Sequence, residues 1–175
     1  MTQTYGMAGL IRWTLISLYL ALVLPLPWLA EGWLRLALAL AVPIGLALVL
    51  AASSERVQLD SEGIRVNHPA WCAWWLRREW MLPWNTITGI RAVSTSQGGK
   101  VFYLQSASGS FLIPQRVERF EQFLDLLNQY SGLETKGIGR ISPPWTYQLL
   151  AALSSIMLIG EVIWAMASRS VPGSF

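Results

Sequence analysis

Three long uncharged runs alternate with polar stretches along this chain. The runs cover residues 13–30, 36–52 and 141–160. Each is long enough, with its flanking residues, to cross the hydrocarbon core of a bilayer as a helix. The pattern predicts a transmembrane helical hairpin in residues 1–52, a polar domain in residues 53–140, and a transmembrane helix with a short tail in residues 141–175.

Within the hairpin, prolines and small residues shape the two predicted helices. Pro25 and Pro27 are expected to end the first helix early, because proline lacks an N–H and disfavours helix at the preceding residue. On the second helix, Ala37, Ala41 and Gly45 recur at four-residue spacing, which allows another helix to approach closely in lipid. Small residues are also common in spans that make no such contact. Both readings of this stripe stay open.

A single carboxylate, Glu161, lies in the apolar region of the last span. A charge inside a bilayer is costly, so such a residue is a functional-site hypothesis by default. The alternative is that Glu161 lies near the far interface, where it snorkels to water or is protonated. We therefore treat Glu161 as a candidate for intramembrane packing together with the small-residue stripe.

The polar domain consists of short alternating runs followed by one amphipathic helix. Strands are predicted at residues 56–59, 64–67, 75–80, 87–94, 100–106 and 110–113, and a helix at residues 116–130. Gly63 closes the first predicted hairpin and is expected to supply a positive φ. Gly132 is expected to end the helix. The helix presents one apolar face, made of Val117, Phe120, Phe123, Leu124, Leu127 and Tyr130.

Several stretches of this domain carry a family resemblance. They are residues 57–66, 82–87 and 111–114, with Ile90 and Val93. Together they resemble the bacterial pleckstrin-homology (PH)-like domain family. The resemblance implies an α+β fold, a PH-like β-sandwich or barrel capped by a C-terminal amphipathic helix. This domain would be inserted between the two-helix transmembrane hairpin and the single C-terminal transmembrane helix.

Other features are similar to a small cyanobacterial branch of that family. They are the additional C-terminal span, the low number of lysine residues, and the amino-acid sequences of residues 96–98 and 112–116. The branch is associated with assembly of photosynthetic membrane complexes. Membership implies a bacterial inner or thylakoid membrane.

Composition and the rarity of reactive residues exclude several function classes. The chain is 53% hydrophobic and 13% charged, and its net charge of +3 is spread without a basic run, which argues against nucleic-acid binding. One cysteine, Cys72, and one histidine, His68, cannot form a disulfide framework or a Cys/His metal cluster. His68 precedes Pro69 in a predicted loop and is expected to be solvated or structural. We predict no enzyme activity, cofactor, metal or small-molecule substrate.

The strongest candidate contact site is an aromatic and basic stretch at residues 71–84. Trp75 and Trp84 are expected in the β core. For the rest of the stretch, a core role and contact with a partner protein or lipid are equally open. These candidate contact residues are Trp71, Trp74, Arg77 and Arg78.

The distribution of charge predicts an orientation. Basic residues flanking the spans are more numerous on the side of the polar domain, which predicts that this domain is cytoplasmic. They are Arg12, Arg56, Lys136 and Arg140, against Arg35 and Arg169. The predicted function is a scaffold or assembly factor that binds other integral membrane proteins through its PH-like domain and spans. The alternative is a sensor of anionic lipid headgroups acting through the same basic and aromatic patch.

Overall fold

A computed structural model describes residues 2–76, 79–96 and 98–170 of this α+β protein. The chain forms two compact units. The sheet unit comprises Met1–Gly9 and Ala51–Pro143, and the helical unit comprises Leu10–Leu50 and Pro144–Phe175. Each is described by itself below.

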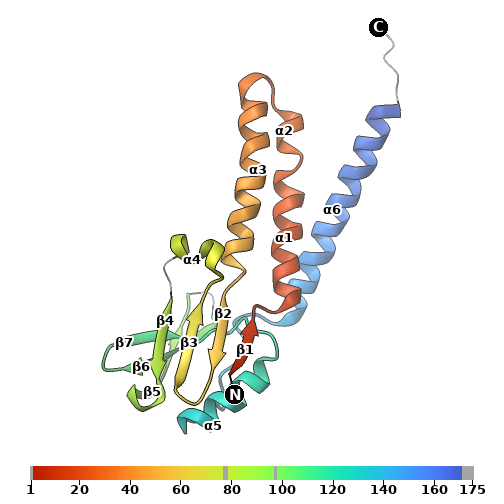
Figure 1. The fold of residues 1–175 in the computed structure, drawn as a ribbon. Helices are drawn as coiled ribbons and strands as arrows, with labels where there is room; N and C mark the ends of the chain where they lie inside the picture. The colour runs from red at the N-terminus through yellow and green to blue at the C-terminus, as the bar shows by residue number, and fades with distance from the viewer. Residues whose placement is uncertain (1, 77–78, 97, 171–175) are drawn as a thin grey trace. The chain divides into compact units, whose positions relative to one another are not determined.

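Apolar helices build the helical unit (Figure 1). They are α1 (Gly9–Val23), the short α2 (Leu26–Leu29), α3 (Gly32–Ala52) and α6 (Pro144–Ser170). Among the described residues, three segments are long and apolar enough to cross a membrane: Gly9–Leu29, Gly32–Ala52 and Pro144–Ser168. The predicted early end of the first helix is confirmed, since α1 stops two residues before Pro25 and a single helical turn follows.

The first sheet of the sheet unit has four antiparallel strands in the order β1-β2-β3-β4. They are β1 (Gln3–Gly6), β2 (Arg56–Leu59), β3 (Gly63–Asn67) and β4 (Trp80–Pro83). The hairpin of β2 and β3 is confirmed. Strand β1 was not predicted, because a four-residue strand with one large apolar side chain leaves almost no periodic signal in a sequence.

A helix, α4 (Ala70–Leu76), occupies the position where a strand beginning at residue 75 was predicted. That prediction was wrong. The peptide N–H groups of Cys72 and Ala73 both donate to the Pro69 carbonyl at 3.0 Å, which begins a helical turn. Strand β4 begins only at Trp80, opposite Val66 of β3.

The second sheet has three antiparallel strands in the order β5-β6-β7. They are β5 (Ile87–Ser94), β6 (Lys100–Ser106) and β7 (Gly109–Leu112). A 3₁₀ turn, η1 (Trp84–Thr86), connects this sheet to the first. All three strands were predicted to within one residue, because Gly-rich turns bound each of the two hairpins.

Helix α5 (Phe120–Ser131) closes the sheet unit and begins four residues later than predicted. The segment before it forms turns around a single bridge between Val117 and Met7. Hydrogen bonds to the N-terminal residues hold it there: Ala8 N–H donates to the Arg116 carbonyl at 2.8 Å, and Glu118 N–H donates to the Gly6 carbonyl at 2.9 Å. Gly132 ends the helix with φ 68°, as predicted. The buried core combines both sheets with α5: Tyr5, Val57, Leu59, Ile64, Val66, Leu82, Phe102, Leu104, Ile113, Val117, Phe120, Phe123, Leu124, Leu127 and Ile138.

Tyr5 connects strand β1 to this core. Its side chain is 1% exposed, and its ring meets Phe123 edge to face with a centroid distance of 5.7 Å. The Arg119 guanidinium lies 5.6 Å from the centroid of the Tyr5 ring. Burial raises the pKa of the Tyr5 phenol although Arg119 opposes this, so the side chain remains neutral at ordinary pH.

Gly63 is required in the first hairpin for a different reason from the one predicted. It is not among the glycines with positive φ, so that expectation was wrong. Instead, a Cβ at this position would overlap the Leu82 carbonyl oxygen of β4. The turn itself is stabilised by the Asp60 carboxylate, which accepts from the N–H groups of Glu62 and Gly63 at 2.9 and 3.0 Å.

Candidate interaction sites

Three exposed tryptophans on α4 form an aromatic surface on the sheet unit. The exposed fractions of Trp71, Trp74 and Trp75 are 55%, 74% and 55%. Their spacing of three and four residues places them on one side of the helix. The Trp74 indole N–H donates to the Trp71 carbonyl at 3.2 Å, which fixes one ring against the helix backbone.

The structure separates the tryptophans of the predicted contact stretch into two groups. Trp75 was predicted in the core and is exposed; that prediction was wrong because α4 is a helix and not a strand. Trp84 packs against the core as predicted: its indole N–H donates to the Asp60 carbonyl at 2.8 Å, and its ring stacks on Tyr130. Arg77 and Arg78 lie outside the described residues.

Cys72 anchors α4 in the sheet unit. It is 2% exposed, and its Sγ lies 3.3 Å from the Ser54 Oγ and 3.4 Å from the Pro69 carbonyl oxygen. The Ser54 hydroxyl in turn donates to the Ala51 carbonyl at 2.7 Å. Ser54 follows the last residue of α3 by two positions in the chain.

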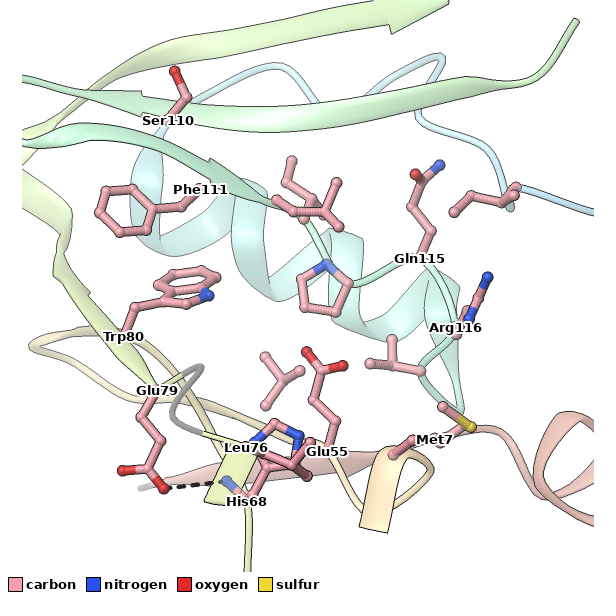
Figure 2. A pocket seen from close by; sticks show the side chains of 17 residues that line it. Met7, Glu55, His68, Leu76, Glu79, Trp80, Ser110, Phe111, Gln115 and Arg116 are labelled. Atoms are coloured by element: carbon pink, nitrogen blue, oxygen red, sulfur yellow. Dashed lines mark hydrogen bonds between the residues drawn. The ribbon is translucent and has the colours of Figure 1, made fainter. Parts of the chain in front are cut away.

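A pocket of about 680 Å³ lies in the sheet unit beside the outer strands β4 and β7 (Figure 2). We call it the seam pocket and define it by Glu55, His68, Glu79, Trp80, Phe111 and Gln115. The rings of Trp80 and Phe111 lie 5.1 Å apart and join β4 to β7. Its volume and its apolar lining with a few polar groups are typical of ligand pockets.

The polar side chains of the seam pocket come from separate parts of the chain. Figure 2 shows the Glu55 carboxylate extending into the space between Trp80 and Arg116. The peptide N–H of His68 donates to the Glu79 carboxylate at 3.4 Å. Sequence reasoning missed this site because the pairing of β3 with β4 and the turn after β7 bring these residues together, and no spacing pattern marks them.

His68, which was expected to be solvated or structural, lines this pocket. Within the described residues, its buried Nδ1 has no hydrogen-bond partner, and no group of three His, Cys, Asp or Glu side chains could hold a metal ion. The one cysteine contacts Ser54 and Pro69. The pocket thus combines a few polar side chains with apolar walls.

In the helical unit, Gly45 allows α3 to approach α1. A Cβ at Gly45 would overlap the Tyr19 hydroxyl, which donates to the Val42 carbonyl at 2.8 Å. Ala37 and Ala41, the other residues of the small-residue stripe, are exposed. The structure thus uses one end of the stripe for packing inside the unit and leaves the rest of it on the surface.

Small polar side chains join α1 to α6. The Thr14 hydroxyl lies 3.2 Å from the Tyr147 carbonyl oxygen, and the Ser17 and Ser154 hydroxyls are 2.8 Å apart. Thr14 is 1% exposed and Ser154 is fully buried. Such side chains allow close packing and hydrogen bonding between helices in lipid. This contact was not predicted.

Glu161 lies on α6 and is half-buried. Its Oε2 is buried and has no hydrogen-bond partner in the part of the chain that the structure describes. Glu161 therefore keeps an unmatched polar atom within an apolar helix.

These features define a class of protein: an α+β chain that combines a helix-capped pair of antiparallel sheets with three helices of membrane-spanning length among its described residues. The chain belongs to the family of the cyanobacterial protein named "Uncharacterized protein slr0269" from Synechocystis sp. (strain ATCC 27184 / PCC 6803 / Kazusa). The two are 35% identical over 162 residues, which cover 89% of this chain and 81% of the relative. No family model and no solved structure matches the chain.

Proposed function

We propose that this protein is a non-enzymatic integral membrane scaffold or assembly factor that binds other membrane proteins through its sheet unit and its spans. One observation carries the proposal: Trp71 and Trp74 are exposed on a short helix that Cys72 anchors in the fold. Tryptophan is enriched at the centre of protein interfaces, where a large rigid ring buries much area at little entropic cost.

The proposed family assignment of the sheet unit is PH-like. Its four-stranded and three-stranded antiparallel sheets, followed by a closing helix, agree with that layout. The cyanobacterial relative agrees with membership of a cyanobacterial branch of that family. The proposed role is biogenesis of photosynthetic complexes in the thylakoid membrane, with the sheet unit on the cytoplasmic side.

This orientation can be tested with a fluorescent protein that matures only in the cytoplasm. Fused before Met1 it should fluoresce, and fused after Phe175 it should stay dark, because three spans place the two ends on opposite sides. Fluorescence from the fusion after Phe175 would contradict the orientation. Immunoblots of both fusions control for expression.

The scaffold function predicts that loss of the aromatic surface removes partners. Trp71→Ala with Trp74→Ala should lower recovery of co-purifying membrane proteins by about tenfold or more, as loss of aromatic anchors does. The measurement is quantitative mass spectrometry after purification of the full chain in mild detergent. Val93→Ala, at another exposed apolar residue of the sheet unit, is the matched control. An unchanged set of partners in the double variant would contradict the proposal.

The lipid-sensor alternative is favoured by the exposed tryptophans of α4. Tryptophan is enriched in the interfacial layer of membranes. Loss of binding to anionic vesicles in Arg77→Glu with Arg78→Glu, while protein partners are retained, would favour this alternative over the scaffold.

A further inference from the structure

Five exposed tryptophans of the helical unit lie close to the ends of its helices. Trp13 and Trp145 lie near the starts of α1 and α6, and Trp33 lies near the start of α3. Trp28 belongs to α2, and Trp164 lies toward the end of α6. Their exposed fractions range from 55% to 81%. Tryptophan is enriched where the hydrocarbon of a membrane meets water, so the heights at which these rings lie are informative.

Contacts between α1 and α6 place Trp13 and Trp145 at one level. The Thr14 hydroxyl lies 3.2 Å from the Tyr147 carbonyl oxygen. Trp13 precedes Thr14 by one residue, and Trp145 precedes Tyr147 by two. At a rise of about 1.5 Å per residue, the two tryptophans differ in height by only a few ångströms. We call this the first tryptophan level and define it by Trp13 and Trp145.

The contact between α1 and α3 places Trp28 and Trp33 at a second level. The Tyr19 hydroxyl donates to the Val42 carbonyl at 2.8 Å, and α3 runs antiparallel to α1 (Figure 1). Trp28 follows Tyr19 by nine residues, and Trp33 precedes Val42 by nine residues. In an antiparallel pair of helices, equal counts from one contact reach equal heights.

Trp164 on α6 lies at the same second level. The Ser17 hydroxyl of α1 and the Ser154 hydroxyl of α6 are 2.8 Å apart. Trp28 follows Ser17 by eleven residues, and Trp164 follows Ser154 by ten. Since α6 runs parallel to α1, we define the second tryptophan level by Trp28, Trp33 and Trp164.

The distance between the two levels matches the thickness of a bilayer interior. Trp145 and Trp164 lie about 28 Å apart along α6 at about 1.5 Å per residue, and the hydrocarbon core of a typical bilayer is about 30 Å thick. Residues 14–27, 36–52 and 146–160 carry no charge. Charged residues reappear at the levels, within three positions of one of these tryptophans: Arg12, Glu31, Arg35 and Glu161.

Hydroxyl groups between the two levels donate to carbonyls within the helical unit, as a hydrocarbon environment requires. They belong to Thr14, Ser17, Tyr19, Ser154 and Ser155. A row of exposed apolar residues follows α3 at four-residue spacing: Leu36, Leu40, Ile44 and Leu48. The helices between the levels thus satisfy these polar groups internally and present an apolar outer surface.

From these observations we infer that the two tryptophan levels are the two interfaces of a lipid bilayer, whose hydrocarbon covers α1, α3 and α6 between them. Glu161 lies three residues before Trp164, about 4–5 Å inside the second level. It therefore belongs to the edge of the hydrocarbon and not to its centre. This inference goes beyond the proposed function, because it assigns the lipid-facing surface and holds whichever partner the sheet unit binds.

Spin labels test this inference in the full chain, reconstituted in vesicles of dioleoylphosphatidylcholine. The variants are Leu36→Cys, Leu40→Cys, Met157→Cys and Glu161→Cys. Leu36 and Glu161 each lie three residues inside the second level, and Leu40 and Met157 each lie seven residues inside it. Electron paramagnetic resonance compares collisions with oxygen, which concentrates in hydrocarbon, and with nickel-EDDA, which stays in water. The wild-type chain is the control for background labelling, since Cys72 is buried.

The labels are expected to give two pairs of equal depth. Those of Leu40→Cys and Met157→Cys should lie about 10 Å inside the second level, and those of Leu36→Cys and Glu161→Cys about 4–5 Å. Access of nickel should be severalfold higher in the shallow pair than in the deep pair. A label in Glu161→Cys as deep as that in Met157→Cys would overturn the inference, and so would unequal depths within either pair.

Discussion

Replacing Phe123 by alanine is expected to lower the free energy of unfolding of the sheet unit by about 3–5 kcal/mol. Phe123 is fully buried on α5, where it contacts Tyr5 edge to face and stacks near Phe120. The loss combines transfer of the ring to water with a cavity between α5 and β1. Pulse proteolysis of the full chain in increasing urea measures the stability of this unit.

Gln122→Ala is the control for this experiment. Gln122 is exposed on the same helix, so truncation there should change stability by less than about 0.5 kcal/mol. If Phe123→Ala were as neutral as Gln122→Ala, the assignment of this face of α5 to the core would be wrong.

Gly63→Ala is expected to destabilise the sheet unit by about 3 kcal/mol, at the upper end of the cost of overpacking. The added methyl group would overlap the Leu82 carbonyl oxygen. That oxygen belongs to the backbone of β4, so it can move only if the pairing of β3 with β4 is distorted. The same urea and proteolysis assay measures the effect.

A second glycine supplies the comparison. Gly89 lies in β5 with open space around the position of a Cβ, so Gly89→Ala should be close to neutral or slightly stabilising. Equal stability of the two alanine variants would show that β3 and β4 do not approach each other closely at Gly63.

The two candidate sites of the sheet unit use different chemistry. The aromatic surface on α4 offers large exposed rings, which suit contact with apolar protein surface or the membrane interface. The seam pocket offers carboxylates and a free strand edge beside two rings.

The sequence by itself determined the elements whose signal is local. The membrane-length helices follow from uninterrupted apolar runs, and β2, β5, β6 and the apolar face of α5 follow from periodicity and from glycine turns. A helix and a strand have different periods, so a pattern that repeats with one period excludes the other type of secondary structure. The exposed tryptophans were identified as a candidate contact site, but not the helix that carries them.

The tertiary structure alone decided what depends on contacts between distant segments. Strand β1 exists because Tyr5 enters a core built from α5 and the first sheet, and α4 forms where Cys72 can pack on Ser54. The Cβ of Gly63 is excluded by a carbonyl that the pairing of β3 with β4 brings close. The seam pocket gathers Glu55, Glu79 and Gln115 in the same way. Such contacts join residues far apart in the chain, and periodicity cannot encode them because it reports only on neighbours.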